Sequence, residues 1–261
     1  MTKHGVDALA ALLRGASEIL IFTGAGISTG SGIPDFRGPQ GIWQTQKPVY
    51  YAEFMGSHEK RVAYWQYKLA GYEQFRDAEP NPTHRAVAAL APKLAAVVTQ
   101  NIDGLHVAGG LDPSLLVELH GTNREVECQT CGARSDPAPA FAAFADTGEP
   151  PLCPCGGFLK PATISFGQSL RRADLERAAD VASRCDLAVA LGSTLSVHPA
   201  ATIPLLAAQR GVPYAIVNRG ATEHDDLPVV SLRLEGDVGE LFVAAVDAAL
   251  HRPGRSEEPR R

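Results

Sequence analysis

Short runs of apolar residues recur along the chain, and each ends abruptly at a glycine or a polar residue. Six such runs lie at residues 19–23, 95–99, 115–119, 187–191, 214–217 and 229–234. A continuous apolar run of this length suits a strand that is buried on both faces, as in a parallel sheet. Ala-rich or amphipathic stretches that predict helices lie between most of the runs, at residues 6–14, 82–91, 171–184, 200–210 and 238–250. The alternation predicts an α/β fold with a parallel sheet and helices on both faces.

Two segments interrupt this alternation. Residues 44–80 are rich in aromatic side chains, which indicates a small helical insert. Residues 124–161 contain four of the five cysteines together with many Pro and Gly, which indicates a loop-rich insert. The sheet domain is therefore expected to comprise residues 1–43, 81–123 and 162–250, followed by a flexible tail at residues 251–261.

The polar residues that follow the apolar runs are expected to lie close together. In an open parallel sheet, ligands bind at the carboxyl ends of the strands, where neighbouring strands meet at one edge. Residues that are far apart in the sequence should therefore line one crevice.

Composition narrows the class of protein. The chain has 261 residues, of which 45% are hydrophobic and 20% charged, with a net charge of −5. These values are ordinary for a globular domain and exclude a disordered chain. The acidic balance argues against a nucleic-acid binder that relies on its overall field, and no apolar run approaches the length of a membrane span. With no signal-like start, we expect a cytoplasmic protein. Separately, we expect it to be a monomer.

The first polar cluster is glycine-rich and directly follows the first predicted strand. It reads Gly24-Ala25-Gly26-Ile27-Ser28-Thr29-Gly30. Glycines allow backbone N–H groups to approach a phosphate closely. However, the spacing departs from the G-x-G-x-x-G dinucleotide fingerprint, and the Lys-Ser/Thr of a P-loop is missing, which argues against a kinase or ATPase. A tight turn that needs glycine for its backbone angles remains an alternative explanation.

The cysteines predict a metal site. Cys128-x-x-Cys131 is followed, after 21 residues, by Cys153-Pro-Cys155. Two such pairs supply four thiolates for a tetrahedral zinc ion, although the second pair has one intervening residue where two are usual. Four protein ligands leave no open position, so the zinc is expected to be structural. Cys185 lies far from the cluster and is interpreted as a buried structural thiol.

A histidine at a predicted strand end is the candidate general base. His120 follows the third run, and the polar residues 100–103 follow the second. A histidine titrates near neutral pH, which suits a base in a crevice, although an isolated histidine is more often a hydrogen-bonded structural residue. No Ser-His-Asp or Cys-His pattern is recognisable, so a covalent hydrolase is not indicated.

Together these segments resemble the sirtuin family of NAD-dependent protein-lysine deacylases. The resemblance rests on residues 24–29 and 31–37, on Thr-Gln-Asn-Ile-Asp-Gly-Leu-His at residues 99–106, and on His-Gly at residues 120–121. It continues through the four-cysteine insert, Gly-Ser-Thr-Leu at residues 192–195, and Val-Asn at residues 217–218. It covers about residues 16–245, nearly the whole chain.

The resemblance implies a Rossmann-like NAD domain and a small domain built from the helical insert and a zinc ribbon. It also implies the reaction: nicotinamide leaves NAD, and the acyl oxygen of a modified lysine attacks the exposed ribose carbon. The products are free lysine, nicotinamide and O-acyl-ADP-ribose. His120 matches the general base for a ribose hydroxyl, while Asn101 and Asp103 match residues that hold the ribose and the carboxamide.

The resemblance further implies the binding residues. The NAD-binding set is Gly24, Ala25, Gly26, Ile27, Ser28, Asp35, Phe36, Arg37, Trp43, Gln100, Asn101, Ile102, Asp103, Gly192, Ser193, Thr194, Asn218 and Val238. The acyl-lysine tunnel and the extended-peptide groove are expected near Phe166, Gly167 and Val197. Partners are acyl-lysine proteins or peptides, and the zinc ligands are Cys128, Cys131, Cys153 and Cys155.

Departures from the family pattern bear on specificity. Gln168 stands where many members have Glu, and Ser165 where many have an aromatic or aliphatic residue. Members that remove acidic acyl groups carry a Tyr-x-x-Arg pair in the helical insert, and residues 64–70 contain no such arginine. We therefore predict a preference for acetyl or another neutral acyl group.

Other functions are compatible with parts of the pattern. Mono-ADP-ribosyl transfer or NAD hydrolysis would use the same cofactor pocket and His120. A zinc-ribbon binding module without catalysis belongs to another class, and the presence of His120, Asn101 and Asp103 argues against it. A dehydrogenase should show the G-x-G-x-x-G fingerprint and an acidic ribose-binding residue, and neither is found.

Overall fold

A six-stranded parallel sheet forms the larger part of the molecule. The computed structural model describes residues 2–35 and 47–251. The strands are β1 (Ile19–Thr23), β2 (Leu94–Thr99), β3 (Leu116–Glu118), β7 (Leu187–Leu191), β8 (Tyr214–Asn218) and β9 (Leu232–Glu235). Their order in the sheet is β3-β2-β1-β7-β8-β9, and every pairing is parallel. The predicted parallel α/β fold is confirmed.

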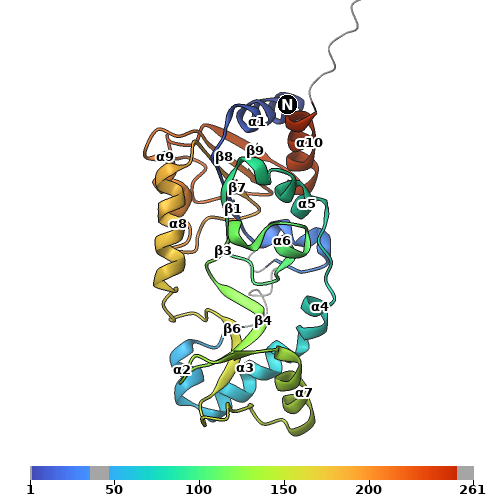
Figure 1. Cartoon of the computed structure of the whole chain (residues 1–261), viewed down its shortest axis with the longest axis vertical. Coiled ribbons are helices and arrows are strands. Elements are labelled where there is room, and N and C mark those ends of the chain that lie inside the picture. The colour runs from blue at the N-terminus through green and yellow to red at the C-terminus, as the bar shows by residue number, and fades with distance from the viewer. Residues whose placement is uncertain (1, 36–46, 252–261) are drawn as a thin grey trace, which may run out of the picture.

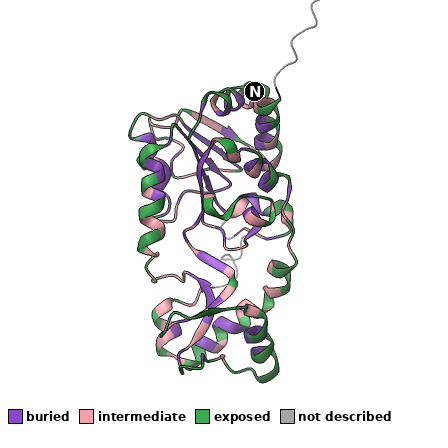
Figure 2. Ribbon diagram, in the orientation of Figure 1, coloured by how far each residue is buried: buried purple, intermediate pink, exposed green. Residues whose placement is uncertain are grey.

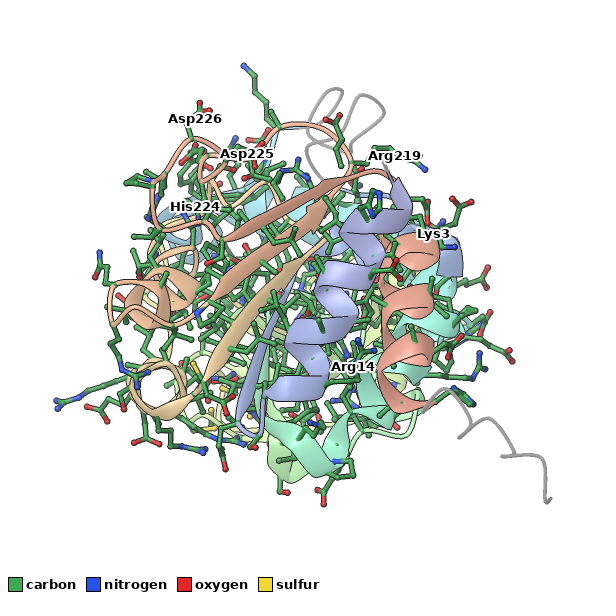
Figure 3. The ribbon with its side chains drawn as sticks, turned by 90° about the horizontal axis from the view of Figure 1, so that it is seen from above. Lys3, Arg14, Arg219, His224, Asp225 and Asp226 are labelled. Atoms are coloured by element: carbon green, nitrogen blue, oxygen red, sulfur yellow. The ribbon has the colours of Figure 1, made fainter. Side chains whose placement is uncertain are left out.

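Helices cover both faces of this sheet (Figures 1 and 2). Packed on one face are α1 (Thr2–Gly15), α5 (Pro82–Ala89) and α10 (Val238–Leu250), and on the other α8 (Arg172–Arg184) and α9 (Thr202–Ala208). Figure 3 looks onto the first face, where α1 and α10 lie side by side in front of the strands. Arg14 on α1 donates a hydrogen bond to the carbonyl of Ala248 on α10 at 2.8 Å.

Each central strand is apolar throughout because it contributes to two cores. In β1, Ile19 and Ile21 enter the core beneath α1 and α10, whereas Leu20 and Phe22 enter the core beneath α8 and α9. Successive side chains of a strand point to opposite faces, so a strand covered on both sides needs apolar residues at every position. This is why the pattern appears as continuous runs.

The two inserts pack against each other in the lower half of Figure 1. The first contains α2 (Tyr51–Gly56), α3 (His58–Ala70) and α4 (Tyr72–Arg76). The second contains an antiparallel sheet of β4 (Gly121–Cys128), β5 (Arg134–Ser135) and β6 (Leu159–Thr163), together with α7 (Pro137–Thr147). They share a third hydrophobic core, in which the centroids of the Trp65 and Phe141 rings are 5.1 Å apart. Of the aromatic residues in the first insert, Phe54, Tyr64 and Trp65 are buried members of this core, whereas Tyr50 is half exposed.

The second insert is more ordered than its Pro and Gly content predicts. The structure shows an 11-residue helix, α7, where loops were expected. Asp136 caps its start by accepting from the Ala138 N–H at 2.7 Å, Pro137 occupies the first turn, and Gly148 ends it with φ +71°. Pro at a helix start and Gly just past its end are capping signals as well as loop signals. Pro and Gly content alone therefore does not distinguish this capped helix from a loop.

Smaller differences concern element ends and connections. The last strand, predicted at residues 229–234, is β9 at Leu232–Glu235. The short helices α6 (Leu105–Ala108) and η5 (Pro113–Leu115) lie in the connection from β2 to β3, and η4 (Ala91–Lys93) joins α5 to β2. Across residues 2–35 and 47–251, no helix has the length and apolar character needed to span a membrane.

Candidate active site

A large cavity lies at the carboxyl ends of the parallel strands and extends to the small insert domain. Its volume is about 1430 Å³. The predicted residues that line it are Gly24, Ala25, Gly26, Asp35, Gln100, Asn101, Ile102, His120, Phe166, Gly167, Gly192, Ser193, Thr194, Val197, Asn218 and Val238. Ile27, Ser28 and Asp103 do not line it, and Phe36, Arg37 and Trp43 lie outside the described residues. One cavity therefore gathers residues from the ends of five parallel strands, β1, β2, β3, β7 and β8.

The glycine-rich loop packs backbone against backbone. After β1 the chain forms two 3₁₀ turns, η1 (Ala25–Ile27) and η2 (Thr29–Ser31). The Gly26 N–H donates to the Gly192 carbonyl at 2.8 Å, and a Cβ on Gly26 would lie 2.8 Å from the Gly192 Cα. A side chain at either position would push the two loops apart. This close approach accounts for the glycines and also leaves the backbone of both loops facing the cavity.

Asn101 is held by Gly24, which lines the cavity, and by Ser28, which does not. Its side-chain amide donates to the Gly24 carbonyl at 3.1 Å and to the Ser28 hydroxyl at 3.2 Å. Ser28 in turn donates to the Asp103 carboxylate at 2.7 Å, which also accepts from the Leu105 N–H. Ser28 and Asp103 are thus placed to orient Asn101. Their predicted contact with a ligand remains a prediction.

The position of His120 fixes the tautomer of its neutral ring. His120 lies between β3 and β4, half-buried, with its Nδ1 atom 3.0 Å from the carbonyl oxygen of Gln100. A carbonyl can only accept, so Nδ1 carries the proton and Nε2 is the basic nitrogen. The Ile164 N–H donates to the His120 carbonyl at 2.8 Å, which ties His120 to the segment that follows β6.

Two buried histidines beneath the loop were not singled out from the sequence. His84 Nδ1 accepts from the Asn81 N–H at 3.3 Å, and His106 Nε2 lies 3.0 Å from the Thr23 hydroxyl. Burial lowers the pKa of His84 to about 4 and the pKa of His106 to about 3. Both rings are therefore neutral near pH 7. No periodicity in the sequence marks these positions, because their burial depends on packing between α5 and α6.

These histidines should make the fold sensitive to acid. In the unfolded chain each binds a proton below its ordinary pKa of 6.5, but in the folded protein only below about 4 or 3. The unfolded chain binds more protons in this window, so the free energy of unfolding should fall as the pH drops from about 6.5 to 4. Urea unfolding at several pH values tests this. His106→Gln should reduce the slope, exposed His4→Gln should not, and equal slopes in both would contradict the assignment.

The small domain places a cation in the cavity. Tyr64, Tyr67 and Lys68, all on α3, line it. The Lys68 ammonium donates to the Asn123 side chain at 3.4 Å, and burial lowers the pKa of Lys68 to about 8. Burial also raises the pKa of Tyr64 to about 12, so its hydroxyl stays protonated. Residues 64–70 contain no arginine, but Lys68 within this stretch supplies a positive charge to the cavity.

The predicted substrate-binding residues come from two parts of the chain that both line the cavity. Phe166 and Gly167 follow β6, and Val197 follows β7. The Phe166 carbonyl accepts from the Tyr51 N–H at 2.9 Å, and the Phe166 ring lies 5.9 Å from that of Tyr50, which is half exposed. Gly167 has φ +78°, a value that favours glycine.

The four predicted zinc ligands form one cluster. The sulfur atoms of Cys128, Cys131, Cys153 and Cys155 all lie within 4.8 Å of one another. Cys128 and Cys155 are 3.6 Å apart, and Cys131 and Cys153 are 3.8 Å apart. Zn–S bonds of about 2.3 Å in a tetrahedron place sulfurs about 3.8 Å apart, so the cluster fits one structural zinc. Cys185 lies elsewhere, buried in the core beneath α8 and α9.

Comparison with known proteins agrees with this fold and site. Residues 24–199 match the model of the Sir2 family. An NAD-dependent protein deacetylase of Rhodopseudomonas palustris is 42% identical over 241 residues, covering 91% of this chain and 94% of that protein. One of Haloarcula marismortui is 40% identical over 264 residues, covering 94% and 98%. The chain therefore belongs to the Sir2 family.

Solved structures give the same result. A Sir2 enzyme solved for its mechanism and regulation has a TM-score of 0.84 and 34% identity, covering 95% of this chain and 98% of that one. A Sir2 complex with a p53 peptide and NAD+ has a TM-score of 0.82 and 33% identity, covering 93% and 97%.

Proposed function

We propose that this protein removes acyl groups from protein lysines with NAD as co-substrate, releasing nicotinamide and O-acyl-ADP-ribose. The observation that carries the proposal is the convergence of His120, Asn101 and the glycine-rich loop on one cavity that Phe166 and Gly167 also line. The relatives named NAD-dependent protein deacetylase and the Sir2 complex with a peptide and NAD+ support it.

The strand ends bind NAD in this proposal. Among residues 24–26 and 192–194, the N–H groups of Gly24, Gly26 and Gly192 donate within the fold, so the backbone N–H groups of Ala25, Ser193 and Thr194 are offered to the phosphates. Asn218 at the end of β8 contacts the adenosine ribose. Asp35, Gln100, Ile102 and Val238 line the remaining cofactor surface. Phe36, Arg37 and Trp43 belong to the same proposal through the resemblance alone.

His120 and Asn101 act on the reacting end of NAD. His120 Nε2 takes a proton from a ribose hydroxyl, because Nδ1 is held as the donor to Gln100. Asn101, oriented by Ser28 and Asp103, holds the ribose and the carboxamide. Ile102 contributes apolar surface that keeps water from the electron-deficient ribose carbon.

The domain division belongs to the proposal as well. Residues 1–43, 81–123 and 162–250 form the NAD-binding domain, and residues 44–80 and 124–161 the small domain. The separate core around Trp65 and Phe141 supports this division. The protein acts in the cytoplasm as a monomer on acyl-lysine segments, and its charge of −5 favours approach of lysine-rich segments.

Incubation with NAD and a panel of acyl-lysine peptides tests the activity and the acyl preference. Acetyl-lysine or another neutral acyl-lysine peptide is expected to be the best substrate, with product masses of free lysine peptide and O-acyl-ADP-ribose. A carboxylate-ended acyl group would have to lose its hydration in a partly apolar cavity. Labelled protein without acyl-peptide turnover would instead indicate mono-ADP-ribosyl transfer.

Lys68 provides the control for the acyl preference. If succinyl-lysine were the best substrate of the wild-type protein and Lys68→Met abolished that preference, Lys68 would be the carboxylate ligand. The prediction of neutral acyl groups would then be wrong. If Lys68→Met leaves the ranking of acyl groups unchanged, the lysine has no part in the choice.

A further inference from the structure

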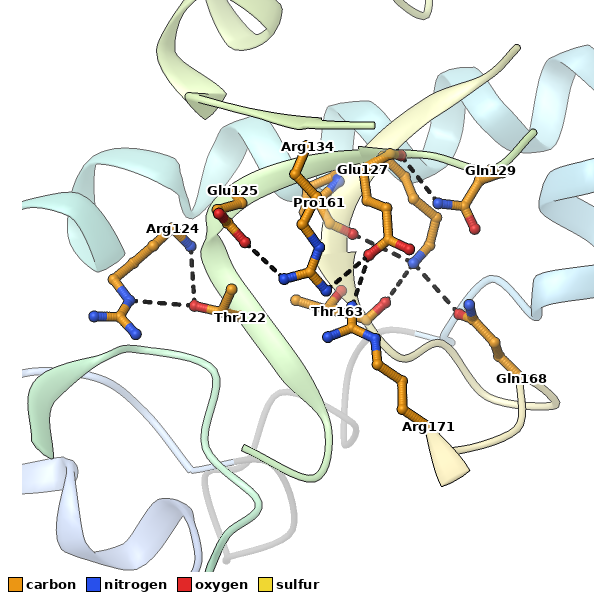
Figure 4. A network of polar contacts seen from close by, with 11 residues as sticks. Thr122, Arg124, Glu125, Glu127, Gln129, Arg134, Pro161, Thr163, Gln168 and Arg171 are labelled. Atoms are coloured by element: carbon orange, nitrogen blue, oxygen red, sulfur yellow. Dashed lines mark hydrogen bonds and ion pairs between the residues drawn. The ribbon is translucent and has the colours of Figure 1, made fainter. Parts of the chain in front are cut away.

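A lysine is buried in the small domain where no cation is expected. Lys160 on β6 is 1% exposed. Its ammonium donates to the backbone carbonyls of Pro161, at 3.3 Å, and Thr163, and to the side-chain oxygen of Gln168 at 3.4 Å. Figure 4 shows these three acceptors converging from β6 and the turn that follows it. An ammonium has three N–H donors, so donors and acceptors match in number.

Gln168 links this lysine to a tight turn. The Gln168 side-chain oxygen also accepts from the Ser165 N–H at 3.1 Å, and the Gln168 N–H donates to the Ser165 carbonyl at 3.0 Å. Gly167, with φ +78°, occupies the position of this turn that favours glycine. Lys160 therefore holds both ends of the segment of residues 163–168, through its hydrogen bonds to the Thr163 carbonyl and to the Gln168 side chain.

This segment is one wall of the active-site cavity. Every residue from 163 to 168 lines the cavity. Ile164, in its middle, donates to the carbonyl of His120 at 2.8 Å, so its position is coupled to that of the candidate base. Lys160 itself does not line the cavity, and it therefore influences ligands only through this wall.

We propose that Lys160, with Gln168 as its partner, is a positioning residue that fixes the wall of residues 163–168 and thereby sets the affinity for the acyl-lysine peptide. The inference rests on the proposed function. Burying an ammonium is costly unless every donor is satisfied, and an apolar residue could fill the same space without that cost. The bonds to the wall segment account for a lysine at this position.

The charge state of Lys160 should affect the wall. Burial and the neighbouring Lys68 lower the pKa of Lys160 to about 7, against the opposing effect of Glu127. The charged groups around it are Lys68 on α3, Glu127 on β4 and Arg171 before α8, and Arg171 is paired with Glu127 at 2.6 Å. A neutral amine has only two N–H donors, so one of the three acceptors loses its donor as the pH rises. Peptide binding should therefore weaken between about pH 6 and pH 8.5.

Steady-state kinetics with an acetyl-lysine peptide and NAD tests the inference. Lys160→Met should raise the KM for the peptide about tenfold, as expected for the loss of charge-assisted hydrogen bonds, and leave the KM for NAD within about twofold. Lys93→Met is the matched control, because Lys93 also binds two backbone carbonyls, those of Arg14 and Ala16, but lies outside the cavity. It should leave the KM for the peptide unchanged.

Gln168→Glu is the second variant. Its carboxylate should keep Lys160 protonated, so the rise of the peptide KM from pH 6 to pH 8.5 should flatten, while in Lys160→Met the pH dependence should disappear. This variant keeps the buried lysine and tests the inference even if Lys160→Met does not fold. An unchanged peptide KM in folded Lys160→Met, a wild-type pH dependence in Gln168→Glu, or an equal effect of Lys93→Met would overturn the inference.

The results that would refute the proposed deacylase activity differ from those that would refute the role of Lys160. Fluorescence anisotropy with labelled acetylated and unacetylated peptides, run beside the turnover assay, separates the two. A wild-type protein with neither acetyl-dependent binding nor turnover refutes the deacylase itself. Acetyl-dependent turnover that is insensitive to Lys160→Met refutes only the role of Lys160.

Discussion

Replacing His120 with alanine should lower kcat for deacylation by about a thousandfold, within the usual range for a general base. The neutral ring is held with Nδ1 donating to the Gln100 carbonyl at 3.0 Å, which leaves the proton-accepting role to Nε2. Alanine removes that acceptor without introducing a charge. NAD affinity measured by calorimetry should change little, because the phosphates and the adenosine are assigned to other strand ends.

The control for this prediction is His58→Ala. His58 starts α3, its side chain is 60% exposed, and its contact with Glu149 lies on the surface. It should retain wild-type kcat and KM. If His120→Ala kept wild-type kcat while remaining folded, the base assignment would be wrong and the proton would have to leave through another group.

Removing one zinc ligand is expected to have the largest effect on stability. Cys128→Ser should abolish zinc binding and unfold the small domain, because a structural zinc site contributes about 10–16 kcal/mol of apparent binding free energy. Cys128 joins β4 to the cluster, and β4 pairs with β6, which leads into the cavity wall. Peptide turnover should therefore be lost together with the metal. Zinc content by elemental analysis and thermal unfolding monitored by circular dichroism measure both effects.

Cys185→Ala separates metal loss from the loss of any buried thiol. Cys185 lies in the core beneath α8 and α9, away from the four-sulfur cluster. This variant should lower the melting temperature modestly and keep one zinc per chain. Treatment of the wild-type protein with a strong chelator should reproduce the Cys128→Ser phenotype. A metal-free wild-type protein that remained folded and active would refute the structural role.

Several features could be predicted because local sequence determines them. The strands of the sheet are visible as continuous apolar runs, since β1 and β8 each contribute alternate residues to two cores. The zinc cluster follows from two closely spaced cysteine pairs. The rule that ligands bind at the carboxyl ends of parallel strands predicts His120 and Asn101 in one crevice, and both line the cavity. In each case the signal lies within a few residues or in a general property of parallel sheets.

Other features could not be predicted because they arise from contacts between distant segments. Ser28 and Asp103 lie 75 positions apart, and their 2.7 Å hydrogen bond places them behind Asn101 and not on the cavity surface. The helix α7 was missed because its caps, Asp136 and Gly148, belong to residue types that also mark loops. Lys68 faces the cavity only because α3 packs against β4 and β6.

The sequence by itself determined the parallel α/β sheet, the cluster of polar strand ends, the four zinc ligands and the resemblance to the sirtuin family. These depend on periodicity, spacing and short motifs. Only the tertiary structure decided that the glycines of residues 24–26 pack against Gly192, and that Lys160 is buried with three acceptors around its ammonium. From the sequence alone, a lysine is predicted to lie on the surface, because its long charged side chain is costly to bury. Its role becomes visible only when the chain folds back to supply the acceptors.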